Sequence, residues 1–147
     1  MTGKVQLHRV FTSTPEKIWR AFTQPDAFAR WLPPNGFVGR ISQMDLKLGG
    51  AWRGSFTNFT SGSEIHFGGN YLELRENECI TYTAKFDDPN LPSEMTTRVT
   101  IKPVSCGVEI HITQSGIPEV IPVEGCYLGW QESLQNLARL VEPNVPG

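Results

Sequence analysis

The feature that most limits how this chain can fold is a long middle segment, residues 36–116, in which apolar and polar residues alternate. A period of two residues is typical of half-buried β-strands. Turn-forming residues interrupt the alternation at 48–50, 60–63, 75–77, 87–90 and 105–107. Between these turns, strands are predicted near residues 36–44, 51–59, 64–75, 79–86, 95–103 and 107–115. Because only short turns join them, consecutive strands should pair as an antiparallel meander.

The last three predicted strands each have an apolar face and a polar face. The residues on the apolar faces are Ile80, Tyr82, Ala84, Phe86, Thr97, Val99, Ile101, Val108, Ile110 and Ile112. The residues on the polar faces are Thr81, Thr83, Lys85, Arg98, Thr100, Lys102, Glu109, His111 and Thr113. One side of the sheet is therefore expected to be dry and the other to face water.

Other elements are predicted on both sides of this segment. Residues 4–11 alternate enough to predict a first strand. A short helix follows, either with Pro15 in its first position and Thr14 as N-cap, or with a capping box of Ser13 and Glu16 one residue earlier. A second short helix is predicted at 25–32. A long helix follows near the end of the chain, where Pro143 is expected to stop it. Its apolar stripe consists of Tyr127, Trp130, Leu134, Leu137 and Val141.

This order of elements predicts one α+β domain over residues 1–147, in which a curved sheet is covered mainly by the C-terminal helix. A helix about 10 Å across cannot cover a seven-stranded sheet, which spans roughly 30 Å. The space that the two short helices leave must be filled by large side chains or remain as a cavity. An empty cavity of ~300 Å³ would cost on the order of 7 kcal/mol. Such a space is therefore expected either to bind a ligand or to be packed shut.

The composition excludes several classes of function. Among the 147 residues, 13 Lys and Arg against 15 Asp and Glu give a net charge of −2, so a nucleic-acid binder is not expected. No apolar run approaches the roughly 18–20 residues of a membrane span. The N-terminus lacks the apolar segment of a signal peptide, and Cys79, Cys106 and Cys126 have no close spacing. We therefore expect a cytoplasmic protein with reduced thiols and no cofactor.

Several segments, spread over nearly the whole chain, resemble a known family. They are Arg9-Val-Phe, Thr14-Pro-Glu-Lys-Ile-Trp-Arg-Ala-Phe-Thr, Pro25-Asp-Ala-Phe-Ala-Arg-Trp-Leu-Pro, Asp45-Leu-Lys-Leu-Gly-Gly-Ala-Trp-Arg, Gly69-Asn-Tyr-Leu-Glu-Leu, Ile80-Thr-Tyr-Thr and Gly129-Trp-Gln-Glu-Ser-Leu-Gln-Asn-Leu-Ala-Arg-Leu-Val-Glu. In this order they resemble the SRPBCC (START-like, helix-grip) superfamily. Within it, the chain is similar to the branch of the C-terminal domain of the activator of the heat-shock-protein-90 ATPase.

The resemblance implies a seven-stranded antiparallel sheet wrapped around the C-terminal helix, with a hydrophobic cavity between them. Superfamily relatives include lipid-transfer domains, plant hormone binders, polyketide aromatases and cyclases, and dioxygenase subunits. The ATPase-activating relative carries an additional N-terminal domain that has no counterpart in these 147 residues, so direct stimulation of the chaperone is not expected. The sequence leaves open whether two copies of the chain form a homodimer.

Two charged residues are candidates for a polar site. Arg9 shares the apolar parity of its strand, and an unpaired buried guanidinium would cost several kcal/mol. Glu73 shares a mostly apolar parity with Phe67 and Tyr71, and it is the predicted partner of Arg9. The pair could be purely structural, Arg9 could instead reach the rim of the sheet, or both could anchor a ligand.

Large apolar side chains are the other candidates for a binding site. Each of them can be ordinary core packing. Together they predict an elongated pocket for a planar or lipid-like molecule, in which Tyr82 could donate a hydrogen bond. The set is Trp31, Trp52, Phe56, Phe67, Tyr71, Tyr82, Phe86, Met95, Thr97, Tyr127 and Trp130.

Neither a metal site nor a catalytic motif is predicted. His8 and His111 have outward parity and, because the resemblance makes the first and last strands neighbours, they could meet on the convex face. A third ligand is not evident in the sequence. The sequence contains no GxSxG, HExxH, P-loop or CxxC motif.

Three functions therefore stay open. The first is binding of an apolar or aromatic small molecule between the sheet and the C-terminal helix. The second is a cyclase- or hydrolase-type reaction in which Arg9, Glu73 or Tyr82 orients and polarises a substrate. The third is a protein-interaction domain related to chaperone activators, which a filled core and an exposed apolar patch would favour.

Overall fold

Seven strands form one antiparallel sheet in the computed structural model, which describes residues 2–147. The elements are β1 (Gly3–Phe11), α1 (Pro15–Thr23), α2 (Pro25–Trp31), β2 (Phe37–Met44), β3 (Ala51–Asn58), β4 (Glu64–Arg75), β5 (Cys79–Phe86), β6 (Met95–Val104), β7 (Gly107–Ile117) and α3 (Val123–Val141). The order of strands in the sheet is β1-β7-β6-β5-β4-β3-β2. Every predicted strand is present, with limits within two residues of those predicted.

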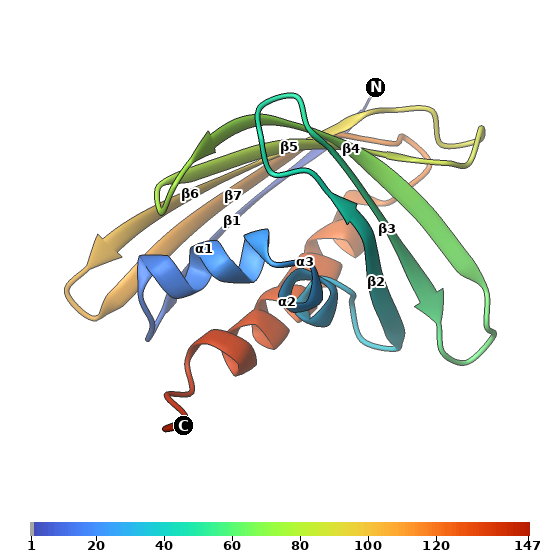
Figure 1. The fold of residues 1–147 in the computed structure, drawn as a ribbon. Helices are drawn as coiled ribbons and strands as arrows, with labels where there is room; N and C mark the ends of the chain where they lie inside the picture. Colours follow the sequence, from blue (N-terminus) through green and yellow to red (C-terminus); the bar gives the residue numbers. More distant parts are fainter. Residues whose placement is uncertain (1) are drawn as a thin grey trace.

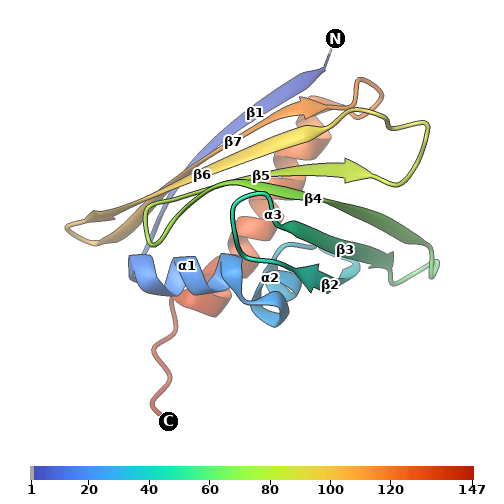
Figure 2. The same ribbon diagram turned by 45° about the horizontal axis from the view of Figure 1, so that its top comes forward.

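The sheet curves around α3, which lies against its concave face together with α1 and α2 (Figures 1 and 2). From β1 at one edge the chain passes through α1 and α2 to β2 at the opposite edge. It then meanders back across the sheet until β7 pairs with β1. The α+β helix-grip architecture is therefore confirmed, including the two short helices after the first strand.

The start of α1 and the end of α3 agree with the sequence prediction. Thr14 has an extended backbone, and its hydroxyl accepts a hydrogen bond of 3.2 Å from the Lys17 amide. Pro15 opens α1, where a missing N–H removes no helical hydrogen bond. α3 ends at Val141, two residues before Pro143, which has no backbone N–H to continue the helical hydrogen bonds.

Aromatic residues of the two short helices build the core beneath one half of the sheet. Trp31 is fully buried, and its indole N–H donates a hydrogen bond of 2.8 Å to the Ala21 carbonyl. The rings of Phe22 and Phe28 meet the Trp31 ring edge-on, with centroids 4.7 and 5.4 Å away. These contacts hold α1 against α2, so Trp31 is a core residue in this part of the fold.

The apolar stripe of α3 faces the sheet, except at its first residue. Trp130, Leu134, Leu137 and Val141 are buried, but Tyr127 is 40% exposed. Tyr127 lies at the margin of the stripe and in the first turns of the helix, so its prediction as an inward-facing residue is wrong. Among residues 2–147, no helix combines the length and the hydropathy that a membrane crossing requires.

A β-bulge in β4 changes which face its last residues occupy. Tyr71 pairs with Tyr82, but Glu73 pairs with Thr81, so Leu72 is an extra residue in β4. One extra residue reverses the parity of every residue that follows it. Glu73 therefore lies on the face of Thr81 and not on that of Tyr71.

The polar face of the sheet is drier at its centre than the sequence predicts. Thr81 and Thr83 are buried rather than exposed. The Thr81 hydroxyl donates to a Glu73 carboxylate oxygen at 3.3 Å, and Thr83 Oγ1 accepts from the Asn70 amide at 2.9 Å. Hydrogen bonds with groups of β4 thus satisfy the hydroxyls of both buried threonines.

Candidate functional site

A cavity of about 310 Å³ lies between the concave face of the sheet and the first half of α3. We call it the α3 cavity. Strands β3 to β7 contribute one wall, α3 contributes the other, and residues that follow α2 close one end. Phe56, Phe86 and Cys126 are only partly buried, and Gly125 is exposed, so these residues mark where the cavity meets solvent.

Aromatic side chains make up most of the sheet wall. Trp52 is positioned by a hydrogen bond of 2.8 Å from its indole N–H to the Thr83 carbonyl. Its ring meets the Tyr82 ring edge-on at 5.5 Å, and the rings of Phe56 and Phe67 meet in the same way at 4.7 Å. Edge-to-face packing is favourable for aromatic pairs, so the wall presents a continuous apolar surface to the cavity.

Gln114 joins the sheet to α3 at the floor of the cavity. Its amide nitrogen donates to Thr97 Oγ1 at 3.0 Å. Its amide oxygen accepts from Trp130 Nε1 at 3.0 Å and from the Cys126 thiol at 3.4 Å. Both hydrogen-bonding ends of this buried amide are therefore occupied by protein groups.

The other polar groups at the cavity are also held by the protein. The Ser133 hydroxyl donates to the Leu32 carbonyl at 2.6 Å, which ties α3 to the residues after α2. Burial raises the pKa of Tyr82, and the hydrogen bond with Thr97 offsets this only in part. Tyr82 therefore stays protonated at neutral pH, where it can donate a hydrogen bond but cannot act as a base.

The charge at the cavity is zero. Among residues 2–147, those that line it include no aspartate, glutamate, lysine, arginine or histidine. Burying an unpaired charge costs far more than burying an apolar group. The arrangement can therefore hold an uncharged molecule, but it offers no partner for an ionic group.

The structure brings together part of the predicted site. The predicted residues that line the α3 cavity are Trp52, Phe56, Phe67, Tyr82, Phe86, Met95 and Trp130. Thr97 is buried behind them, where it bonds to Gln114. Tyr71 and Trp31 belong to the neighbouring core, and burial raises the pKa of Tyr71 to about 12. Tyr127 is on the outer side of α3, away from the lining.

The predicted pairing of Arg9 with Glu73 is wrong. Arg9 donates to Gln135 Oε1 at 3.2 Å, and its guanidinium lies 5.2 Å from the centre of the Phe11 ring. Glu73 instead forms ion pairs with Arg75 at 3.2 Å and Arg98 at 3.6 Å. The bulge at Leu72 is the reason, because it turns Glu73 to the convex face while Arg9 remains on the concave side.

Glu73 is expected to make stability depend on acid pH. A hydrogen bond from the Cys79 thiol, one from Thr81 and the charges of Arg75 and Arg98 lower the pKa of Glu73 from its usual 4.5. The stability that this shift provides is present above the unfolded-state pKa and is lost as the pH falls through the folded-state pKa. Glu73→Gln should therefore reduce the drop in the urea midpoint between neutral pH and pH values below 4.5.

Glu76→Gln is the matched control for this substitution, because Glu76 is exposed in the turn that follows β4. The control should keep the full acid-dependent drop of the parent protein. An equal drop in the Glu73→Gln variant would contradict the role of the Glu73 network.

Sequence analysis missed ten of the residues that line the cavity, and Gln114, Gly129 and Ser133 are three of them. Gln114 continues the apolar parity of Val108, Ile110 and Ile112 on β7, so its position could have been predicted from the alternation. Gly129 and Ser133 are four residues apart on α3, which places them on one helix face. No signal in the sequence shows that the Gln114 amide bonds to Trp130, because that contact depends on how α3 docks.

Comparison with known proteins shows the family of this chain. The model of the family described as Activator of Hsp90 ATPase homolog 1-like protein matches residues 12–142. None of the curated proteins matches the chain. A similar solved structure is that of protein CV1439 from Chromobacterium violaceum, with 51% identity and a TM-score of 0.94 over 96% of this chain and 98% of that one.

More distant solved structures share the fold alone. Protein NE0264 from Nitrosomonas europaea is 20% identical, with a TM-score of 0.77 over 93% of this chain and 92% of that chain. Protein Ms6760 from Mycobacterium smegmatis is 14% identical, with a TM-score of 0.79 over 97% of this chain and 93% of that chain. The helix-grip architecture therefore persists where few residues are shared.

Proposed function

Since the chain belongs to the family of Activator of Hsp90 ATPase homolog 1-like proteins, we propose that it is a binding domain for an uncharged apolar or aromatic small molecule. The ligand would occupy the α3 cavity. The observation that carries this proposal is a cavity of about 310 Å³ with an aromatic wall and no charged lining residue among residues 2–147. That volume is at the lower end of the roughly 300–1,000 Å³ of small-molecule sites.

The stability of the fold supports a binding role for this space. A sealed, empty cavity of this size would cost on the order of 7 kcal/mol, at ~24 cal/mol per Å³. The partial opening to solvent lowers this penalty but leaves apolar walls exposed to water. An apolar ligand removes that exposed surface, which contributes roughly 25 cal/mol for each Å² buried.

The chemistry of the lining supports an uncharged ligand. Gln114 and Ser133 are already hydrogen-bonded within the protein. A ligand with a carboxylate or an ammonium group would lose its hydration without gaining a partner. Aromatic ligands would gain further from the edges and faces of Trp52, Phe67 and Trp130.

Gly129→Leu is expected to block binding without disturbing the fold. Gly129 lines the cavity, and a Cβ atom at this position would have no heavy atom within 4 Å, so the leucine side chain can extend into the open space. Leucine also favours a helix more than glycine does. The uncharged fluorescent probe N-phenylnaphthylamine should bind the parent protein, and the variant should bind it at least about tenfold more weakly, a loss of roughly 1.4 kcal/mol.

Gln131→Leu is the matched control, because it adds the same side chain to an exposed position of α3 outside the cavity. It should leave the affinity for the probe unchanged. Naphthalene should displace the probe and naphthoate should not, since the latter carries a charge. Equal binding by the Gly129→Leu variant, or equal competition by naphthoate, would contradict the proposal.

The two alternative functions have less support. Acid–base catalysis needs a group with a pKa near the working pH beside the substrate, whereas burial moves the pKa of Tyr82 further from neutrality. A protein-interaction role would be favoured by a filled core together with an exposed apolar patch. Val120 and Leu128 are exposed near the start of α3, but the space beside this helix is open.

A further inference from the structure

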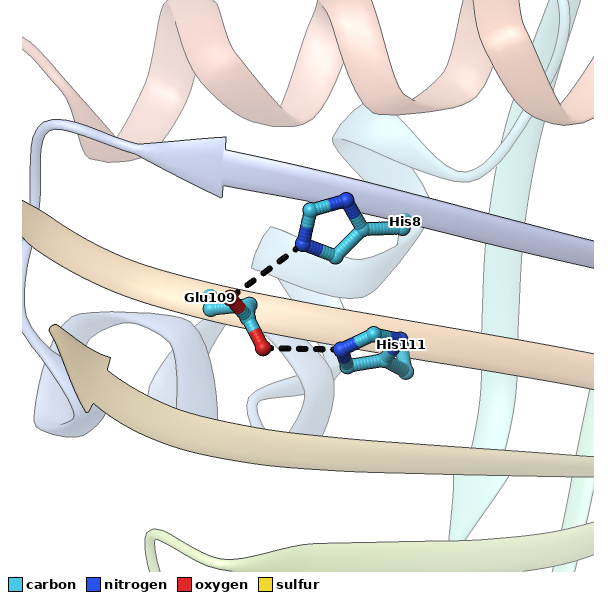
Figure 3. Close-up of side chains that lie close together, drawn as sticks. All are labelled: His8, Glu109 and His111. Atoms are coloured by element: carbon cyan, nitrogen blue, oxygen red, sulfur yellow. Dashed lines mark hydrogen bonds and ion pairs between the residues drawn. The ribbon is translucent and has the colours of Figure 1, made fainter.

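Two histidines and a glutamate lie close together (Figure 3). They are on the convex face of the sheet, because they alternate with Leu7, Ile110 and Ile112, which are buried on the concave side. His8 on β1 and His111 on β7 are directly opposite in the strand register, and their ring centroids are 4.5 Å apart. Glu109 precedes His111 by two residues, so both side chains share one face. One Glu109 oxygen is 2.8 Å from His111 Nε2, and the other is 3.3 Å from His8 Nε2.

We propose that His8, Glu109 and His111 bind a divalent transition-metal ion, with zinc as the best match. Two imidazoles and one carboxylate are a donor set that zinc accepts, with a water molecule as the fourth ligand. Zinc holds nitrogen and oxygen ligands at about 2.0–2.2 Å, so tetrahedral ligand atoms lie about 3.3 Å from one another. The three ligand atoms here already lie within 4.8 Å of one another.

The backbone holds these three side chains close to the geometry that an ion needs. The pairing of β1 with β7 is regular from Lys4 to Phe11, and its only shift lies at Gly3. Both histidines project from paired strands, where the positions of their Cβ atoms are set by the sheet. Binding would therefore require only side-chain rotations, with little ordering of the main chain.

The surroundings of the cluster allow an ion to enter from solvent. The side chains of His8 and His111 are 51% and 55% exposed, while that of Glu109 is 25% exposed. Lys102 on β6 lies opposite Glu109, and Thr100 lies opposite His111. The Lys102 charge would oppose a cation, so we expect moderate rather than very tight affinity.

Metal binding would have a structural consequence, because β1 is an edge strand. Within the sheet β1 pairs only with β7, and the cluster joins these two strands. An ion held by His8 from β1 and by Glu109 and His111 from β7 would cross-link the edge. A ligand that binds only the folded state raises its stability by mass action.

Calorimetric titration of the metal-free protein with zinc chloride tests the site. We expect binding of one ion per chain, and a rise in the thermal midpoint with zinc. His8→Gln and His111→Gln should each weaken zinc binding at least about tenfold. Replacing a group that only hydrogen-bonds to a metal ligand typically weakens metal affinity about 10–100-fold, and loss of a ligand itself should weaken it no less. Cobalt, which takes the same ligands, should give the visible absorption of a tetrahedral site in the parent protein but not in the His8→Gln or His111→Gln variant.

Two controls separate this cluster from other metal ligands. His66→Gln removes a histidine that lies 3.9 Å from Glu64 in an exposed pair with no second histidine, and it should leave zinc binding unchanged. Cys106→Ser removes the exposed thiol and should also leave it unchanged. The proposal is overturned if zinc does not bind, if folded His8→Gln and His111→Gln variants bind it as the parent does, or if Cys106→Ser abolishes binding. Far-UV circular dichroism verifies that each variant is folded.

Discussion

Leu137→Ala should lower the free energy of unfolding by about 3 kcal/mol. Leu137 is fully buried on the inner face of α3, and it belongs to the main apolar core. Truncation removes buried methyl groups and leaves a cavity that the surrounding strands cannot fill. Urea unfolding followed by tryptophan fluorescence should show a lower midpoint with an unchanged denaturant slope.

Leu128→Ala is the matched control, because it makes the same chemical change on the same helix at a position that is 62% exposed. Its effect should stay within about 0.5 kcal/mol. Equal stability of the two variants would contradict the prediction that burial of the inner face of α3 stabilises the fold.

Gln114→Leu should cost about 2 kcal/mol of stability, although leucine is of similar size and more apolar. The substitution removes the acceptor of the Trp130 indole N–H and the donor to Thr97. The main penalty is a buried indole N–H that is left without a partner. Thermal or urea unfolding of the variant measures this loss.

A double-mutant cycle can assign that loss to the hydrogen bond. Trp130→Phe removes the indole N–H, after which Gln114→Leu leaves no donor of Trp130 unsatisfied. The two substitutions together should therefore cost less than the sum of their separate effects, by about 1 kcal/mol. Strictly additive effects would show that Gln114 acts only through its volume.

The two proposed sites use opposite faces of the same strand. Gln114 of β7 points to the α3 cavity, whereas Glu109 and His111 lie on the convex face. This follows from the alternation of side chains along a strand. Variants at His111 should therefore leave binding of the fluorescent probe unchanged, and Gly129→Leu should leave zinc binding unchanged.

The elements of the fold could be predicted because each depends on neighbouring residues. The alternation over residues 36–116 predicts the six consecutive strands, and Thr14 with Pro15 predicts the start of α1. Two aromatic residues of the cavity wall, Phe67 and Tyr82, were found in the same way, from the alternation along their strands. In each case the information lies within one strand or one helical turn.

The errors arose where that local information ends. The Arg9–Glu73 pairing failed because a single extra residue, Leu72, reverses the parity of β4 beyond it. Tyr127 was expected to face inward, but it is exposed because it lies at the margin of the helix stripe. The meeting of His8 with His111 was predicted from parity and the family resemblance, and it is confirmed. The third member of that cluster, Glu109, was not recognised as a partner.

The sequence by itself determined the order of the elements, the turns between them and most of the inward-facing residues, because periodicity and capping act over a few positions of the chain. Only the tertiary structure decided which polar groups meet: Gln114 with Trp130 beneath the α3 cavity, and His8 with Glu109 on the convex face. Each of those contacts joins residues from two different elements of the fold. They depend on the register of β1 against β7 and on the depth at which α3 docks, and these are set by the packing of the whole core.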